Sequence, residues 1–265
     1  MRTSGLSGIL LLMAFCLPQT VPESFCGLRN TAFQSGETVT YKIYYTLAGV
    51  YLEAGRVNFS CRAESFQGKP AYHLVAVGNT LPFYDNFYKV RDRYESFIDS
   101  TSMRPYQFTR SVSEGDQKKY ENISFNKAGG TAITGNGVYK VPECIQDVLS
   151  AMYVARNLNF DGLRPGDKIP FSMFLDNQVY PSYIRYLGKE IIKTKYGSFH
   201  AIKFKPLLIR GTLFQAGEKM TVWVSDDPNH IPLRVESAVT VGKVKADMMD
   251  FRNRRAPLSS QISLR

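Results

Sequence analysis

The sequence predicts a mainly β protein: a large curled antiparallel sheet, open and barrel-like, with about 12 strands and one central α-helix. Three observations lead to this fold class. Apolar and polar residues alternate with period two from about Gly36 onward, which is typical of half-buried strands. Clusters of turn-forming residues separate these segments at short intervals. Only one segment has helical periodicity, and a sheet of this size must curl, close or split into layers.

Before the first strand, residues 1–24 have the layout of a secretory signal peptide: Arg2 comes first, then a short apolar core, then a polar exit with prolines. The core is shorter than the roughly 20 residues of a membrane-spanning helix, so we expect no transmembrane segment in the mature chain. Phe15 in front of Cys16 does not fit a lipid-attachment pattern. We therefore expect export to the periplasm or cell surface of a Gram-negative bacterium.

The strand pattern continues almost to the end of the chain. The predicted strands lie near residues 39–45, 57–61, 72–78, 88–99, 105–112, 118–125, 130–134, 169–175, 180–193, 199–207, 218–225, 233–239 and 243–251. Turn signals such as Glu114-Gly115-Asp116 and Asp226-Asp227-Pro228-Asn229 separate them. We expect a single β-rich domain over residues 25–254 and a loose C-terminal tail over residues 255–265.

One helix interrupts the strands. Pro142 and Glu143 open it, and apolar residues then recur at helical spacing up to about Leu158. The core-facing positions that we assign to it include Val148, Leu149 and Met152. This helix either fills the concave side of one curled sheet or joins two smaller β domains, and the absence of a Pro/Ser-rich linker favours the single unit.

The chain is basic, with a net charge of +10 and a pI near 9.4. Such a charge attracts anions, and in an exported protein these are lipid head groups, acidic glycans or an acidic partner protein. The cations are scattered, without a basic block or a recognition helix, so we expect no nucleic-acid partner. A solvated basic surface without a partner is the plainer interpretation.

The cysteine pattern leaves the redox state open. With Cys16 in the export segment, the mature chain keeps Cys26, Cys61 and Cys144, an odd number in a compartment that permits disulfides. A bridge between Cys26 and Cys61 is one interpretation, and three unpaired thiols are another. No Cys-x-x-Cys or Cys/His pair is present, so the sequence predicts no metal site and no cofactor.

Catalytic motifs are missing as well. The sequence has no Gly-x-Ser-x-Gly elbow, no His-Glu-x-x-His motif and no phosphate-binding glycine loop. His73, His200 and His230 lie far apart along the chain. Carboxylates that a glycosidase would need occur at Asp92 with Glu95 and in the turn at Asp226-Asp227, where structural roles are the plainer interpretation. We name no catalytic residue and expect a non-enzymatic protein.

The strongest candidate for a binding site follows Pro82. Four aromatic residues within six positions are followed by cations, and together they would form a binding lip in which rings supply apolar contact and cations hold an anion. The ligand-binding candidates are Phe83, Tyr84, Phe87, Tyr88, Lys89, Arg91 and Arg93. The alternative is a loop whose rings only cap the open end of the sheet.

The chain also resembles a family of exported bacterial envelope proteins of unknown function, the DUF3108 family. Its features here are the Gly36-Glu37…Tyr41 strand opening, the 88–96 segment, the 146–153 helix and the 163–167 loop. The resemblance covers most of residues 33–252 and implies a curled antiparallel sheet like those of periplasmic lipoprotein and lipid carriers, without a settled enzymatic role. Under this resemblance, Asp147 beside Ser150 holds the helix against the sheet.

These observations lead to three functional hypotheses. The first is non-enzymatic binding of a lipid or another apolar envelope component in a groove between the sheet and the helix. The second is a structural or protein-interaction module of an envelope assembly, which contacts an envelope protein through a sheet edge or the aromatic lip. The third is an unrecognised glycan-active enzyme. A concave face filled by the helix would favour scaffold or interaction roles over the first.

Overall fold

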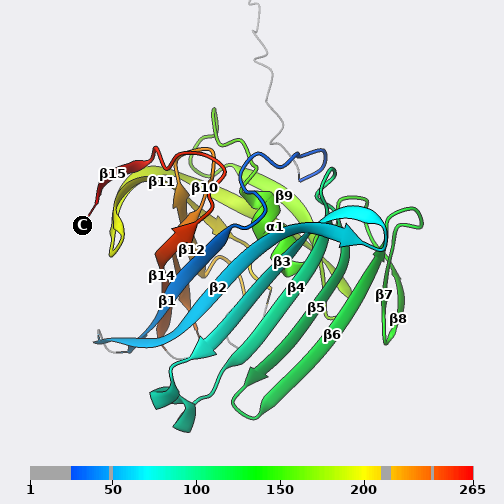
Figure 1. Ribbon diagram of the computed structural model, residues 1–265, viewed down its shortest axis with the longest axis horizontal. Helices are drawn as coiled ribbons and strands as arrows, with labels where there is room; N and C mark the ends of the chain where they lie inside the picture. Colours follow the sequence, from blue (N-terminus) through cyan, green and yellow to red (C-terminus); the bar gives the residue numbers. More distant parts are fainter. Residues whose placement is uncertain (1–24, 48–49, 210–215, 240–241, 265) are drawn as a thin grey trace, which may run out of the picture.

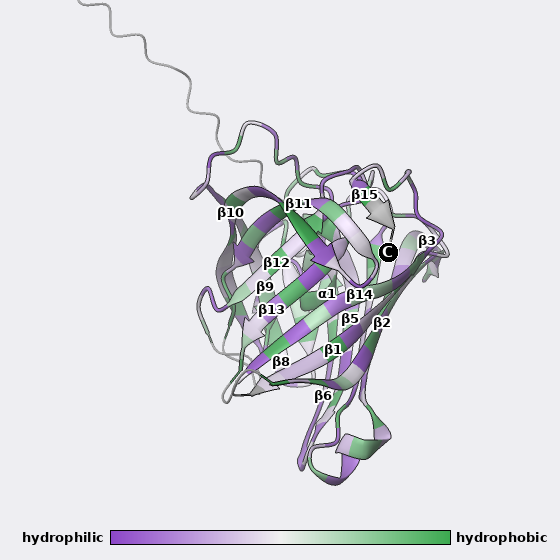
Figure 2. Cartoon of the chain, turned by 90° about the vertical axis from the view of Figure 1, so that its left-hand side faces the viewer, coloured by the Kyte–Doolittle hydropathy of each residue, from purple (hydrophilic) through white to green (hydrophobic). Residues whose placement is uncertain are grey.

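A computed structural model describes residues 25–47, 50–209, 216–239 and 242–264. The predicted signal peptide, residues 1–24, lies outside the described residues. Within them, the fold is a large antiparallel sheet with one α-helix, as the sequence predicts (Figure 1). Hydrophobic and hydrophilic residues alternate along the strands in Figure 2, which is the pattern that predicted them.

The first half of the chain forms a meander of neighbouring strands. Its elements are β1 (Thr38–Leu47), β2 (Val50–Phe66), β3 (Lys69–Thr80), the 3₁₀ turn η1 (Pro82–Asn86), β4 (Arg91–Asp99), β5 (Pro105–Glu114), β6 (Gln117–Asn126), β7 (Thr131–Thr134) and β8 (Gly137–Lys140). Each strand pairs with the next in antiparallel register. Short hairpin loops make this topology the simplest way to satisfy the backbone hydrogen bonds.

The second half extends the same sheet from the other side of β1. It contains α1 (Val148–Ala155), β9 (Lys168–Leu175), β10 (Gln178–Thr194), β11 (Gly197–Pro206), β12 (Met220–Ser225), β13 (Pro232–Ala238), β14 (Lys243–Arg252) and β15 (Gln261–Leu264). In the described part of the chain the strand order is β8-β7-β6-β5-β4-β3-β2-β1-β14-β13-β12-β11-β10-β9, with β15 beside β11. Because β1 pairs with β14, both halves belong to one sheet, and α1 does not join two separate β domains.

The helix is shorter than the sequence predicts. It begins at Val148 because Asp147 caps it: the Asp147 carboxylate accepts hydrogen bonds from the backbone N–H groups of Leu149 and Ser150, both at 2.8 Å. Before the cap, Glu143 and Cys144 form a turn, and Gln146 exchanges backbone hydrogen bonds with Ser172 and Phe174 of β9. The proline-led helix start at residue 142 is therefore wrong, since β9 pairs with the segment that the helix would have used.

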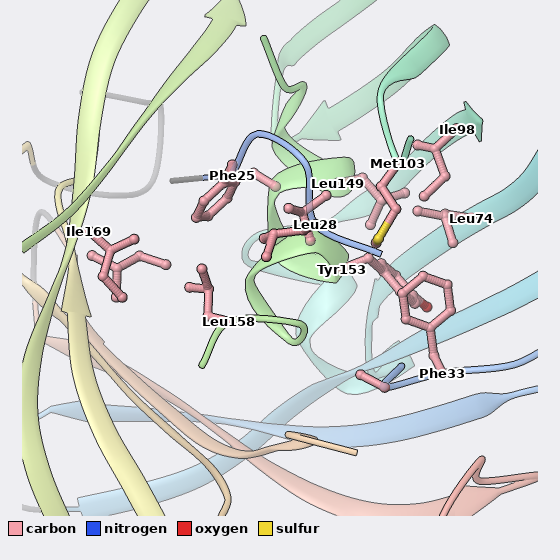
Figure 3. Close-up of a cluster of buried hydrophobic side chains, with 14 of the residues drawn as sticks. Phe25, Leu28, Phe33, Leu74, Ile98, Met103, Leu149, Tyr153, Leu158 and Ile169 are labelled. Carbon is pink, nitrogen blue, oxygen red and sulfur yellow. The ribbon is translucent and has the colours of Figure 1, made fainter. Parts of the chain in front are cut away.

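The concave face of the sheet is filled. Figure 3 shows side chains of α1 and of the N-terminal segment packed against strand residues such as Leu74 and Ile98. Leu149 is buried as predicted and Val148 is half-buried, but Met152 is 43% exposed and does not belong to the core. With only two turns, α1 directs Leu149, Tyr153 and Val154 into the core and leaves Met152 on its outer side.

Two further expectations are corrected. The disulfide joins Cys26 to Cys144 and leaves Cys61 as a buried thiol, because the N-terminal segment crosses the concave side next to the residues that precede α1. The tail is not loose over the described residues: Gln261–Leu264 pairs with β11, and Ser260 donates a hydrogen bond of 2.6 Å to the buried Asp227. The tail contributes few apolar residues to the core, and hydrogen bonds to buried polar side chains such as Asp227 hold it in place.

Candidate functional site

The predicted lip lies at one end of the sheet. The 3₁₀ turn η1 starts where the backbone N–H of Leu81 donates to the Ala54 carbonyl of β2, at 2.9 Å. It projects beyond the ends of β3 and β4 in Figure 1, on the side where the β1–β2 hairpin also ends. The hairpin between β5 and β6 closes against it, since the Gly115 N–H donates to the Lys89 carbonyl at 2.8 Å.

Large apolar side chains are exposed at this end of the molecule. Phe83 is 71% exposed and Phe87 79%, although their ring centroids lie only 6.1 Å apart. The same end of the sheet also exposes residues of β2 and of the loop after η1. We call this surface the aromatic rim, and its residues are Val50, Tyr51, Leu52, Phe83, Phe87 and Tyr88. Tyr84, also a predicted ligand-binding residue, is half-buried and packs edge-on against Phe83.

The rim keeps fewer available cations than the sequence suggests. Arg91 binds the Asp85 carboxylate through two hydrogen bonds, of 3.0 and 2.5 Å, and so fixes the loop rather than facing a ligand. The Arg91 hydrogen bond also lowers the pKa of Asp85. Arg93 is paired with Glu95 at 2.5 Å. Lys89 is exposed, and the described structure gives it no ion-pair partner.

Beneath the rim, two carboxyl groups lie near each other. Asp92 accepts a hydrogen bond of 3.0 Å from the backbone N–H of Ser113. Burial raises the pKa of Asp92 to about 6, and the neighbouring Glu114 carboxylate contributes to the increase. Arg91 binds Asp85 rather than Asp92, so no cation among the described residues offsets the increase in the pKa of Asp92.

At the opposite end of the sheet, the chain buries charged and polar groups. We call this region the anchored end: residues 25–37, α1 with Arg156, the turn 226–231 and residues 253–261. Arg156 donates two hydrogen bonds, of 2.5 and 2.9 Å, to the Glu37 carboxylate, and both side chains are at most 5% exposed. Its Nε also donates to the Asn229 carbonyl. Burial acts to lower the pKa of Arg156, but Glu37 outweighs it, so the pKa is raised and the guanidinium stays charged.

The predicted structural role of Asp147 is confirmed at the same end. Besides capping α1, its carboxylate accepts a hydrogen bond of 2.7 Å from the Ser96 hydroxyl of β4 and so ties the helix to the sheet. The Ser150 hydroxyl accepts from the Asp147 backbone N–H in return. Burial raises the pKa of Asp147 to about 6 despite these hydrogen bonds.

A basic groove lies where the β10–β11 turn meets β13 and β14. Its cavity has a volume of about 250 Å³, and cations from both sides line it together with one carboxylate. The lining residues are Lys193, Thr194, Lys195, Gly197, Ser198, Arg234, Lys245 and Asp247. Sequence reasoning missed this groove because the two segments are about 40 residues apart; the only signal was the spacing of two Lys-x-Lys pairs, at 193–195 and 243–245.

The histidines and the predicted carboxylate pairs occupy separate places. His73 lies between Glu64 and Glu95 and stacks on Phe97, and the His230 Nδ1–H donates to the Arg156 carbonyl. Asp226 pairs with Lys189, whereas Asp227 binds Ser225, Asn229 and Ser260 inside the anchored end. No group of three or more His, Cys, Asp or Glu side chains with metal-site geometry occurs among the described residues.

Comparison with known sequences identifies the family of the chain. The sequence model of the DUF3108 family, proteins of unknown function, matches residues 40–249. The chain belongs to the DUF3108 family. The match extends from β1 to β14, so it includes α1, the aromatic rim and the basic groove. No curated protein matches the chain.

A solved structure shares the fold of this DUF3108 protein. A beta-barrel-like protein of the DUF1849 family from Brucella abortus has a TM-score of 0.55 at 8% identity, over 86% of this chain and 99% of that one. A protein from Bacteroides fragilis described as exported, with a YmcC-like fold, matches with a TM-score of 0.32 at 11% identity, over 85% and 99% of the two chains. The first supports the barrel-like fold. In the described residues, none of the helices has the length and hydropathy of a membrane span.

Proposed function

We propose that this protein is a non-enzymatic envelope protein that binds the surface of a lipid membrane through its aromatic rim. The observation that carries this proposal is the exposure of Phe83 and Phe87, 71% and 79%, at the tip of a projecting turn. A soluble protein normally exposes apolar side chains singly, and a cluster of them marks a binding surface. Phe and Tyr at loop tips suit the membrane interface, where the rings enter the apolar layer.

Two features favour a lipid surface over a groove of a partner protein as the binding partner of the aromatic rim. Lys89 is exposed beside the projecting rings, and an anionic head group attracts such a charge by about 1 kcal/mol. The rim is also rigid: Arg91 holds η1 through Asp85, and Thr80 donates to the same carboxylate at 2.7 Å. A preformed apolar tip loses little conformational entropy on binding.

The concave groove that the sequence suggested for a lipid is a poorer candidate. Residues of α1 and the N-terminal segment, among them Phe33, Leu149 and Val154, are almost completely buried there. A bound acyl chain would have to displace them. A lipid contact at the rim requires no such rearrangement.

The sheet edges also favour the rim over an edge-pairing role. The outer strand β9 is covered by Gln146, whose backbone hydrogen bonds occupy part of it. The other outer strand, β8, has only four residues. A short or covered edge offers few free backbone groups to a partner strand.

The expected compartment agrees with the disulfide. Cys26 and Cys144 join segments 118 residues apart, and such bridges persist in oxidising compartments. Together with the predicted signal peptide, this supports action in the periplasm or at the cell surface.

The test is sedimentation with vesicles of phosphatidylcholine alone and of phosphatidylcholine mixed with phosphatidylglycerol. We expect wild-type protein to bind the anionic vesicles more tightly. Phe83→Ser with Phe87→Ser should weaken binding at least about tenfold, because burial of one Phe contributes on the order of 1.5–3 kcal/mol. A matched control is Val138→Ser with Ile191→Ser, which removes exposed apolar side chains of other surfaces, 66% and 59% exposed.

Equal binding by both double variants, or no binding of the wild type to either vesicle, would overturn the proposal. If instead an envelope protein is captured by the wild type, and lost with the Phe variant while vesicles never bind, the rim is an interaction surface for protein. Circular dichroism of each variant distinguishes loss of binding from loss of fold.

A further inference from the structure

The basic groove is built from parts of the chain that are far apart in sequence. The end of β10 supplies Lys193 and the turn after it Lys195, while Arg234 and Lys245 come from β13 and β14. The Arg234 guanidinium donates to the Lys193 carbonyl at 3.0 Å, which holds the turn against the sheet. The groove is therefore a fixed feature of the fold and not a gap beside a free loop.

Charge in the groove is strongly unbalanced. Four cations face one carboxylate, Asp247, so the lining carries a net charge of +3. Asp247 is already used: it accepts from Arg234 at 2.6 and 3.2 Å, with Lys245 3.3 Å away. The nearby Glu53 is paired with Lys42 at 2.9 Å.

Three lysines thus line one hollow, and among the described residues only Lys245 has an ion-pair partner, the Asp247 carboxylate that it shares with Arg234. Clustered like charges repel one another, and an anion that binds between them removes this cost. Lysine ammonium groups bind phosphate as compact point charges, and a tetrahedral group can offer one oxygen to each. A carboxylate has only two oxygens and suits this arrangement less well.

The volume of the groove and the residues around it indicate a ligand larger than a single phosphate ion. The cavity volume of about 250 Å³ is several times the roughly 30 Å³ that one water molecule occupies. Two aromatic rings lie beside one of its lining residues: the Lys245 ammonium is 4.9 Å from the ring centroid of Tyr44 and 4.8 Å from that of Tyr51, which is 61% exposed. Such rings provide flat apolar faces beside the cations.

We infer that the groove between the β10–β11 turn and β13–β14 binds a phosphomonoester carried on a sugar-sized polar body. Lys193, Lys195 and Lys245 hold the phosphate, Arg234 and Asp247 keep the groove in shape, and the Tyr51 ring covers part of the attached body. The site shares Tyr51 with the aromatic rim, but its cations take no part in the lipid contact proposed for Phe83 and Phe87. The phosphomonoester has two sources, a soluble sugar phosphate or a lipid head group.

The test is isothermal titration calorimetry of the full mature protein with glucose 6-phosphate and, for comparison, glucose. We expect binding of the phosphate ester and none of glucose. Lys195→Gln with Lys245→Gln should weaken it at least about tenfold, since hydrogen bonds to charged groups contribute on the order of 1.5–3 kcal/mol each. Lys118→Gln with Lys140→Gln is the matched control, because it removes the same charge from other strands, and we expect a change below twofold.

Vesicles that contain phosphatidic acid, whose head group is a phosphomonoester, separate the two sources. Binding of these vesicles but not of glucose 6-phosphate, lost with the groove variant, assigns the lipid source. Loss of affinity in both lysine variants alike would mean that only net charge matters and would overturn the inference, as would an absence of binding in both arms. The Phe83/Phe87 variant should keep its affinity for glucose 6-phosphate, so failure of either proposal is recognisable separately.

Discussion

The two ends of the sheet use polar and apolar residues in opposite ways. The anchored end buries a charged pair, Arg156 with Glu37, while the aromatic rim exposes Phe83 and Phe87 to solvent. Both arrangements are costly unless something compensates for them. At the anchored end the compensation lies inside the molecule, in hydrogen bonds. At the rim no described residue covers the rings, which is why we assign their partner to the outside.

The comparison also separates stability from function. Segments that are distant in sequence meet at the anchored end, where hydrogen bonds from Arg156 reach Ala32 and Asn229. The rim is built from local hairpins, and Arg91 and Asp85 that hold it are six residues apart. Changes at the anchored end should therefore alter the free energy of unfolding, and changes at the rim should alter binding.

The largest effect is expected from Arg156→Met. It leaves the Glu37 carboxylate buried without its partner, which costs about 3–5 kcal/mol of unfolding free energy. Arg93→Met, which removes an arginine from a solvent-exposed pair with Glu95, should cost less than about 1 kcal/mol. Urea unfolding measures both. The comparison fails if the two variants are equally stable, and Arg156→Met combined with Glu37→Met should recover part of the loss.

The disulfide should rank second. Cys26→Ser with Cys144→Ser removes the bridge between positions 118 residues apart. We expect the free energy of unfolding to fall by about 2–4 kcal/mol in the same urea assay. The bridge holds the N-terminal segment over α1, so proteolysis near residue 26 should become faster. Reductant should destabilise the wild type and have no further effect on the double variant; an insensitive wild type would contradict this role.

The sequence predicted the features that depend on local pattern. Alternation of residues such as Tyr41 and Ile43 predicted strands, and one helical stretch predicted α1, because both periodicities follow from backbone geometry. The position of the aromatic lip was also predictable, since a proline followed by four rings in a short loop cannot bury them all. Met152 was misplaced because the buried face of the helix is formed by Leu149, Ser150, Tyr153 and Val154, and Met152 lies on the other side.

Features that depend on distant segments were not predictable. Cys144 pairs with Cys26 only because the N-terminal segment crosses the concave side, and no spacing in the sequence encodes that path. Arg156 and Glu37 are 119 positions apart, and nothing near either residue marks it as buried. The basic groove likewise exists only after β10–β11 folds against β14.

The pH dependence of stability tests the carboxyl group under the rim. The pKa of Asp92 is about 6 in the folded protein, against an ordinary 3.8, so the folded state holds this proton more tightly than the unfolded state. The resulting stabilisation is fully present below about pH 4 and is lost as the pH rises through 6. The stability of the wild type relative to Asp92→Asn should therefore increase between pH 7 and pH 4. A constant difference across that range would contradict the raised pKa.

The smallest effect on stability is expected from the residues with the largest expected effect on binding. Phe87 is 79% exposed and Phe83 71%, so the folded state gains little from either ring, and each Phe→Ser change should alter the unfolding free energy by no more than about 0.5 kcal/mol. Phe33→Ala is the matched contrast, because Phe33 is fully buried between Tyr72 and Tyr153, and it should cost about 3–5 kcal/mol.

The size of the stability loss in Phe87→Ser relative to Phe33→Ala decides whether the rim is part of the fold or a binding surface. If Phe87→Ser destabilised the protein as Phe33→Ala does, the ring would be part of the fold, held by its contact with Phe83, and its exposure would need no ligand. If stability is unchanged and vesicle binding falls, the two rings contribute to binding and not to the stability of the fold. Two large apolar side chains are then maintained on a rigid turn at the cost of solubility, and only an external apolar partner gives that arrangement a physical purpose.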